Sequence, residues 1–143
     1  MPDASEETAG GPWARFVRWA RSRRFRVADR SMEPTLVPGD CLYVDRGAYR
    51  ERTPARGDLV VAREPDPPHR FFVKRVGLVG GDLLPPGTLE RTATTTVPRG
   101  FVFLLGDNPR MSDDSRRFGP VPVGSLVGRA YRCYRPPERR RDF

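Results

Sequence analysis

One lysine stands alone in a chain that uses arginine for every other cation. Lysines and arginines total 26 among the 143 residues, and Lys74 is the single lysine. It lies in residues 71–76, a run of aromatic and β-branched side chains that favours a strand and puts Lys74 on one face with Phe72 and Val76. Arginine stays protonated in proteins, whereas a lysine withdrawn from water can lose its proton and act as a base. Lys74 is therefore a candidate general base, and the alternative is a surface lysine whose stem covers the sheet.

Two further stretches carry side chains that could act with such a base. Ser31 precedes Met32-Glu33-Pro34, and the proline disfavours helical geometry just before it, so the hydroxyl is expected on an extended stretch or turn. Residues 106–116 follow a strongly apolar run and read Gly-Asp-Asn-Pro-Arg-Met-Ser-Asp-Asp-Ser-Arg. This loop combines hydroxyls with a carboxylate and a guanidinium, which indicates either an ordinary polar turn or a loop that orients a neutral amine by hydrogen bonding.

The cysteines and the histidine do not indicate metal or thiol chemistry. Cys41 and Cys133 form no CxxC and no metal-ligand spacing, and each is expected as a buried free thiol in a strand. His69, the one histidine, lies in a proline-rich loop, which disfavours a zinc centre and a Ser-His-Asp triad. We therefore expect no metal and no cofactor.

Short strands are the elements expected to position these residues. Sixteen prolines and 14 glycines separate short apolar runs, which predicts a single, mostly β domain of antiparallel strands over residues 27–134. The strands are expected at residues 41–44, 58–62, 71–76, 101–105 and 125–134, with an irregular hairpin over residues 83–100.

The two ends of the chain are expected to differ from this β domain. Residues 1–11 are polar and predicted to be disordered, and residues 135–143 are predicted to be a flexible tail. Between residues 1–11 and the domain, apolar residues recur at helical spacing among arginines, which predicts a short basic amphipathic helix over residues 12–26. The apolar positions are Trp13, Phe16, Val17 and Ala20. Such a helix either contacts a membrane surface or a partner, or packs on its own domain.

The net charge of +8 would suit nucleic acid or an anionic membrane surface. The arginines are spread along the chain, however, and much of the excess lies at its two ends, so no nucleic-acid partner is expected. No apolar run approaches the roughly 18–20 residues needed to span a bilayer, and the N-terminus lacks a secretory signal. The expected location is the cytoplasm, with peripheral contact at the inner face of the membrane as the alternative.

In their order along the chain, these stretches resemble the motif set of the type I signal peptidase family. The motifs are Ser-Met-x-Pro-Thr-Leu from Ser31, Val-Lys-Arg-Val around Lys74, and Gly-Asp-Asn-x-x-x-Ser-x-Asp-Ser-Arg from Gly106. The resemblance covers about residues 27–132. It implies a signal-peptidase-like β fold and a serine endopeptidase with a Ser/Lys dyad, which needs no metal.

The resemblance also implies a role for each matching residue. Ser31 matches the nucleophile, with its backbone N–H facing the oxyanion, and Lys74 matches the general base. The remaining matches are Ser112, which orients the lysine amine, Asp114 and Arg116, which form a supporting ion pair, Ser115, which has a structural role, and Met32 and Phe72, which contact substrate.

The chain also departs from the family pattern. Asp29 stands where many relatives carry Ser or Gly, and because a carboxylate would repel a developing oxyanion, Asp29 is expected to point elsewhere. Pro109 replaces the usual arginine of the third motif, and the transmembrane anchor is missing. The last departure makes the chain most similar to the small soluble branch that matures nickel-type superoxide dismutase by removing an N-terminal leader.

The expected function is therefore removal of a leader peptide from a precursor protein, with the nickel superoxide dismutase precursor as the expected substrate. One alternative is a signal peptidase that cleaves exported preproteins while residues 12–26 hold it at the membrane. Another is an inactive basic binding module on the same fold. The oligomeric state stays open.

Overall fold

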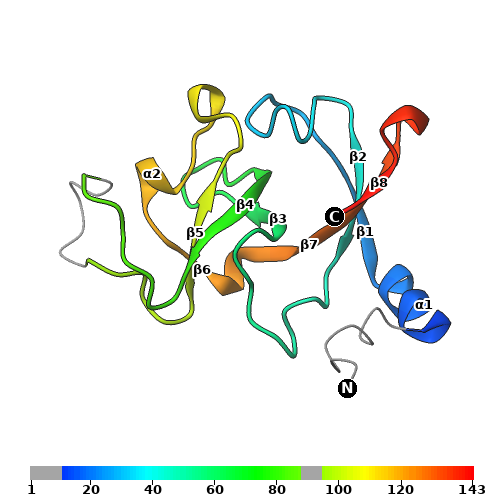
Figure 1. Cartoon of the computed structure of the whole chain (residues 1–143), viewed down its shortest axis with the longest axis horizontal. Coiled ribbons are helices and arrows are strands. Elements are labelled where there is room, and N and C mark those ends of the chain that lie inside the picture. Colours follow the sequence, from blue (N-terminus) through cyan, green and yellow to red (C-terminus); the bar gives the residue numbers. More distant parts are fainter. Residues whose placement is uncertain (1–10, 88–94) are drawn as a thin grey trace, which may run out of the picture.

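Eight strands form one antiparallel sheet in the computed structural model, which describes residues 11–87 and 95–143 (Figure 1). The strands are β1 (Ser22–Arg26), β2 (Cys41–Asp45), β3 (Leu59–Arg63), β4 (Phe71–Val79), β5 (Phe101–Leu105), β6 (Val121–Pro122), β7 (Leu126–Arg135) and β8 (Arg141–Asp142). Their order is β1-β2-β7-β3-β4-β5-β6, and β8 pairs with β7. The mostly β, antiparallel fold expected from the sequence is confirmed, and each strand expected after residue 40 is present.

The sheet bends because its central pairings contain β-bulges. The register shifts between β2 and β7, between β3 and β7, and between β4 and β5, and such shifts increase the local twist. At Gly128 of β7, a Cβ atom would lie 2.2 Å from the carbonyl oxygen of Asp45, so only glycine permits the close approach of β2 there. In Figure 1, β7 runs between β1, β2 and β8 on one side and β4, β5 and β6 on the other.

Two hydrophobic clusters fill the faces of the bent sheet. Alternation along β3 sends Leu59 and Val61 into the first cluster and Val60 and Ala62 into the second. The first cluster also contains Val27, Met32, Leu36, Leu42, Val44, Val73, Ala130 and Cys133, and the second contains Phe72, Val76, Val102, Leu104 and Val121. Burying one such aliphatic or aromatic side chain contributes about 1.5–3 kcal/mol. Because β3 and β4 are covered on both faces, they form a rigid base for the residues they carry.

The N-terminal helix α1 (Pro12–Ala20) is shorter than the sequence predicts. The prediction of helix through residue 26 is wrong, because Ser22–Arg26 forms β1 and all five of its residues pair with β2. Phe25 of β1 packs against the first cluster, which explains why this arginine-rich segment joins the sheet. Among the described helices, none is both long and apolar enough to cross a membrane.

The C-terminal segment is ordered, so its prediction as a flexible tail is wrong. A 3-10 turn, η3 (Pro137–Arg139), precedes β8, and Phe143 packs against the first cluster. Arg139 Nε donates to Asp40 Oδ1 at 2.7 Å, which fixes the segment to the turn before β2. These contacts join residues far apart in sequence, and composition alone does not show them.

Short helical turns complete the described chain. They are η1 (Pro109–Met111), α2 (Ser115–Phe118) and η2 (Val123–Ser125). Of the hairpin expected over residues 83–100, residues 88–94 lie outside the described range, and its ends meet in a bridge between Leu83 and Thr96. The prediction for residues 1–11 falls almost wholly on residues 1–10, which are also outside that range.

Candidate active site

Ser31 lies on the turn that connects β1 to β2, and both its backbone and the neighbouring Met32 fix its position. Ser31 is 2% exposed, and its carbonyl oxygen accepts a hydrogen bond from the backbone N–H of Asn108 at 2.8 Å. The next residue, Met32, is fully buried in the first cluster. The turn therefore has little freedom to move relative to the sheet, which keeps the hydroxyl in place.

Lys74 extends from the middle of β4 to the Ser31 hydroxyl. The distance from Lys74 Nζ to Ser31 Oγ is 2.7 Å, and the lysine is 2% exposed. The ring of Phe72, on the same face of β4, has its centroid 5.0 Å from the amine. Within the described part of the chain, Ser31 is the sole hydrogen-bond partner of this amine, and no carboxylate forms an ion pair with it.

Burial lowers the pKa of Lys74 from its ordinary value of 10.5, because the charged amine loses its hydration. The negative charges of surrounding carboxylates oppose this shift without cancelling it. These carboxylates are Asp29, Asp114, Asp113 and Glu64. A neutral amine 2.7 Å from a hydroxyl can accept the proton of that hydroxyl, which is the chemistry a serine nucleophile needs.

Asp114 is the centre of the loop formed by residues 106–116. Its carboxylate accepts hydrogen bonds from the Gly106 backbone N–H at 2.9 Å, from Ser112 Oγ at 2.7 Å, and from the Arg116 guanidinium, at 2.9 Å for Nε and 2.6 Å for Nη2. Burial raises the pKa of this carboxyl, but the hydrogen bonds from Arg116, Gly106 and Ser112 outweigh burial, and the net pKa is lowered. The ion pair expected between Asp114 and Arg116 is therefore present.

Ser112 sits beside the Ser31 turn but donates to Asp114. A Cβ atom on Gly106 would lie 2.1 Å from Ser112 Oγ and 2.7 Å from the Ser31 carbonyl oxygen. Only glycine at this position therefore lets the Ser112 segment pack directly against the Ser31 turn. In the described chain, no hydrogen bond joins Ser112 to the Lys74 amine. The role of Ser112 in orienting that amine thus stays a prediction.

Asp29 does not point away from the site, contrary to expectation. Its Oδ1 accepts the backbone N–H of Ser31 at 2.9 Å. That N–H is the group which the family resemblance assigns to the oxyanion. The sequence shows that a carboxylate stands at this position, but the direction of its side chain depends on the geometry of the turn.

The other residues expected at the site have structural contacts. Ser115 Oγ accepts the backbone N–H of Leu104 at 2.8 Å, which fixes the start of α2 to β5. Met32 Sδ accepts the backbone N–H of Asp107 at 3.4 Å, and Phe72 packs in the second cluster, 6.1 Å from the ring of Phe118. Substrate contact by Met32 and Phe72 stays a prediction.

Asp107 links all three motifs, and sequence reasoning missed it. Arg75 donates to both of its carboxylate oxygens, at 2.9 and 2.8 Å, and Thr35 Oγ1 donates to Oδ2 at 2.6 Å. Each of these residues stands within or beside one motif, so one carboxylate ties the nucleophile turn, the lysine strand and the third-motif loop together. The signal was present in the sequence, as an arginine directly after Lys74 and an aspartate directly after Gly106.

Metal-ligating side chains do not gather in the described residues. No group of three or more His, Cys, Asp or Glu side chains there has the arrangement that could hold a metal ion. Cys133 is buried and Cys41 is partly exposed, and both are free thiols. His69 Nδ1 contacts the backbone oxygen of Glu64 in the exposed turn between β3 and β4.

The sequence matches a known protein family over most of its length. The profile of the family described as "Signal peptidase, peptidase S26" matches residues 12–85 and 86–134. One relative, the mitochondrial ATP-independent inner membrane protease subunit 1b of Arabidopsis thaliana, is 44% identical over 69% of this chain and 62% of its own length. The human mitochondrial inner membrane protease subunit 1 is 37% identical over 71% of this chain and 62% of its own.

Two more distant relatives are similar over part of the chain. The thylakoidal processing peptidase 1 of Arabidopsis thaliana is 30% identical over 81% of this chain, and the match covers 43% of that protein. A crystal structure of a signal peptidase I from Enterococcus faecalis has a TM-score of 0.45 and 27% identity, and covers 55% of this chain and 97% of that chain. The chain thus spans less than two thirds of the length of several of these relatives.

The names of these relatives correct the expected location. The two mitochondrial relatives are named as inner membrane proteases, and a third relative is named as a thylakoidal processing peptidase. The expectation of a cytoplasmic protein is therefore wrong, and the absence of an apolar run in the sequence was an insufficient basis for it.

Proposed function

The chain belongs to the peptidase S26 family of signal peptidases, and from that premise we propose that it is a serine endopeptidase which removes an N-terminal leader from a precursor protein. The observation that carries this proposal is the 2.7 Å contact between Ser31 Oγ and a buried lysine amine. A general base must lie within about 2.6–3.2 Å of the proton it removes. The supporting observation is the linkage of all three motifs through Asp107.

In the proposed mechanism, the neutral Lys74 amine takes the proton of Ser31 as Oγ attacks the scissile carbonyl carbon. The C–N bond then breaks, Lys74 gives the proton to the leaving amine, and an ester joins the leader to Ser31. A water molecule that gives its proton to Lys74 attacks this ester. As the ester C–O bond breaks, Lys74 returns that proton to Ser31 Oγ, and the leader is released as a carboxylic acid. The hydrogen bonds among Ser112, Asp114 and Arg116 keep the loop beside Ser31 in place during both steps.

Asp29 has to release the Ser31 N–H before that group can bind the oxyanion. An oxyanion beside an unprotonated carboxylate would meet repulsion instead of stabilisation, and the loss of one oxyanion donor costs roughly a hundredfold or more in kcat. We propose that substrate binding turns the exposed Asp29 side chain outward. Support comes from its position, since in the described residues its carboxylate has the Ser31 N–H as its hydrogen-bond partner and no ion pair with arginine.

Two classes of precursor are candidate substrates. The nickel superoxide dismutase precursor follows from the family resemblance and finds no support in the names of the relatives. A precursor presented at a membrane is favoured by those names, and we propose that α1 is the element which contacts the membrane. The third reading, an inactive basic module, is opposed by the intact Ser31–Lys74 contact.

Cleavage of a precursor tests this proposal. The chain is incubated with each precursor class, and the N-terminus of the product is determined by mass spectrometry. We expect one shortened product, absent with Ser31→Ala. Lys74→Arg should be as inactive as Lys74→Ala, because arginine keeps the charge but cannot accept the proton. Substantial cleavage by the arginine variant would refute the assignment of the base.

A further inference from the structure

The aromatic side chains of α1 face solvent. Trp13, Phe16 and Trp19 are 74%, 53% and 59% exposed, and none of the helix residues is buried. Their rings form a continuous ridge, with centroids 5.8 Å apart for the first pair and 6.1 Å for the second. The ridge contains the chain's only two tryptophans. Tryptophan is enriched where proteins meet the lipid–water interface, and an exposed aromatic ridge indicates an interaction surface.

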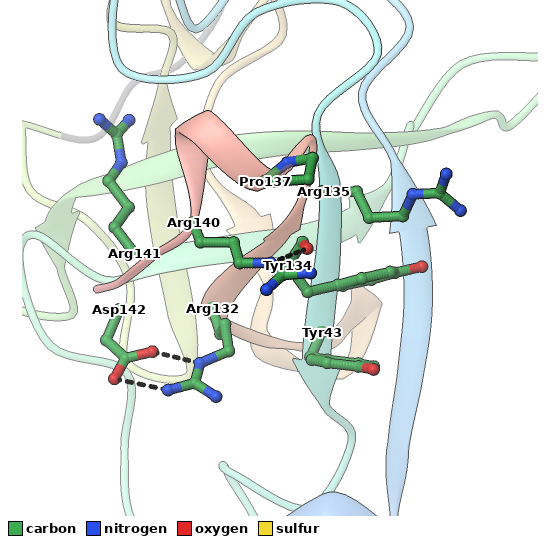
Figure 2. A pocket seen from close by; sticks show the side chains of 8 residues that line it. All are labelled: Tyr43, Arg132, Tyr134, Arg135, Pro137, Arg140, Arg141 and Asp142. Atoms are coloured by element: carbon green, nitrogen blue, oxygen red, sulfur yellow. Dashed lines mark hydrogen bonds and ion pairs between the residues drawn. The ribbon is translucent and has the colours of Figure 1, made fainter.

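A groove rich in tyrosine and arginine lies on the neighbouring strands. Its volume is about 710 Å³, and the rings of Tyr43 on β2 and Tyr134 on β7 stack with centroids 4.2 Å apart (Figure 2). The remaining lining residues are Arg132, Arg135, Pro137, Arg140, Arg141 and Asp142. We call these eight residues the tyrosine–arginine groove. Its four arginines outnumber its one carboxylate, so its charge is positive.

Arg135 and Arg140 have guanidinium donors that no described residue accepts. Arg132 is paired with Asp142 at 2.6 Å, and Figure 2 shows this pair to the left of Tyr43. Arg135 makes no side-chain hydrogen bond or ion pair with any described residue. Arg140 donates from Nε to the Tyr134 carbonyl oxygen at 3.1 Å, and its two terminal guanidinium nitrogens have no hydrogen-bond partner among the described residues. Guanidinium groups bind phosphate oxygens through two parallel hydrogen bonds, so these side chains suit a phosphate group.

The largely buried Tyr131 of β7 contacts both α1 and the groove. The Arg18 guanidinium of α1 lies 4.3 Å from the Tyr131 ring centroid, and the Tyr131 ring lies 6.2 Å from that of Tyr43. The pKa of Asp142 is lowered first by its hydrogen bond with Arg132 and further by the charges of Arg18 and Arg15. The arginines of α1 therefore act electrostatically on the groove.

We propose that α1 and the tyrosine–arginine groove together form a docking surface for an anionic phospholipid bilayer. The aromatic ridge enters the interfacial zone, and Arg135 and Arg140 bind lipid phosphates. Charge complementarity favours this occupant, because α1 contains arginines and no acidic residue, and the adjoining groove has an excess of positive charge. The proposal refines the membrane contact suggested above and does not depend on the peptidase mechanism.

Tryptophan fluorescence of the full chain measures docking directly, because both tryptophans lie in the ridge. We expect a blue shift and co-sedimentation with vesicles of phosphatidylcholine and phosphatidylglycerol, and little of either with phosphatidylcholine alone. Arg135→Gln and Arg140→Gln should each weaken binding roughly fivefold, as expected for one arginine near an anionic surface. Phe16→Ser, which keeps both tryptophans, should reduce the blue shift.

A matched variant separates the surface from the overall charge. Arg99→Gln removes the same charge from an exposed loop outside the surface, and it should bind vesicles almost as the parent chain does. An equal loss in Arg99→Gln, or no blue shift with phosphatidylglycerol, would overturn the proposal. Binding of duplex DNA as tightly as vesicles would overturn it in favour of a nucleic-acid surface. Cleavage of a short peptide without vesicles should be unchanged in every variant, so failure of docking and failure of the protease are distinguishable.

Discussion

At the scale of single residues, two opposing effects decide whether the Lys74 amine carries a proton. Burial beside Phe72 and Ser31 favours the neutral form, and the surrounding carboxylates favour the charged form. The base has to be neutral to act, so kcat/KM should rise with pH through the pKa of Lys74 and level off below 10.5, the ordinary lysine value. A rate that does not change with pH would contradict a titrating lysine.

Glu64→Gln tests this dependence without touching the dyad. The Glu64 charge raises the pKa of Lys74, so its removal lowers that pKa and leaves more neutral amine at any given pH. The rising limb of the pH–rate profile should therefore move to lower pH, with the plateau unchanged. A limb that stays in place, or moves to higher pH, would mean that Lys74 is not the group being titrated.

Asp29→Asn should change the plateau of the pH–rate profile as well as the position of its rising limb. Loss of the charge lowers the pKa of Lys74, as in Glu64→Gln, but it also removes a carboxylate from the Ser31 N–H. We expect kcat at the plateau to rise severalfold for Asp29→Asn and Asp29→Ser and to stay constant for Glu64→Gln. A lower plateau in both Asp29 variants would show that the carboxylate assists catalysis and does not block the oxyanion donor.

At the scale of elements, the loop over residues 106–116 depends on one buried carboxylate. The pKa of Asp114 is lowered in the folded chain, so its ionised form adds stability above the unfolded pKa, and that stability is lost as pH falls through the folded pKa. Arg116→Gln removes the strongest lowering contact. It should reduce the free energy of unfolding at pH 7 by about 1–3 kcal/mol and move acid unfolding to higher pH.

Thermal and acid unfolding, followed by circular dichroism, measure both effects. Arg117→Gln is the matched control, because Arg117 pairs with the exposed residues Asp66 and Asp113 instead of a buried carboxylate. An acid midpoint that moves equally in the two variants would contradict a special role for Asp114.

Strands and motifs were predictable from the sequence, and the connections between distant segments were not. Residues 101–105 and the strand with Lys74 are apolar enough to be predicted as strands from their own sequence. The residue types of the third motif are enough to predict its polar contacts. The strand over Ser22–Arg26 was missed because its sequence is mostly arginine and its stability comes from pairing with β2. The orientation of Asp29 was missed because the fold of the turn sets side-chain direction.

At the scale of the whole molecule, a bent sheet with a cluster on each face brings the three motifs together, and the C-terminal segment closes it. Asp40, with a side chain 1% exposed, accepts the Arg139 guanidinium at 2.7 and 3.0 Å. Arg139→Gln leaves this carboxylate buried without its charge partner and should lower the free energy of unfolding by about 2–4 kcal/mol. Chemical denaturation measures the loss, with the exposed Arg140→Gln as control, and equal stability of the two variants would contradict this role.

Catalysis by this pair of residues requires that the buried Lys74 amine is neutral when it meets the Ser31 hydroxyl. Since Lys74 is the single lysine, a chain labelled with ¹³C-lysine gives one side-chain Cε resonance, and its titration by NMR reports this pKa alone. We expect a midpoint below 10.5 that coincides with the rising limb of the pH–rate profile. A midpoint at or above 10.5 would mean that the amine stays charged, and would contradict its role as the base.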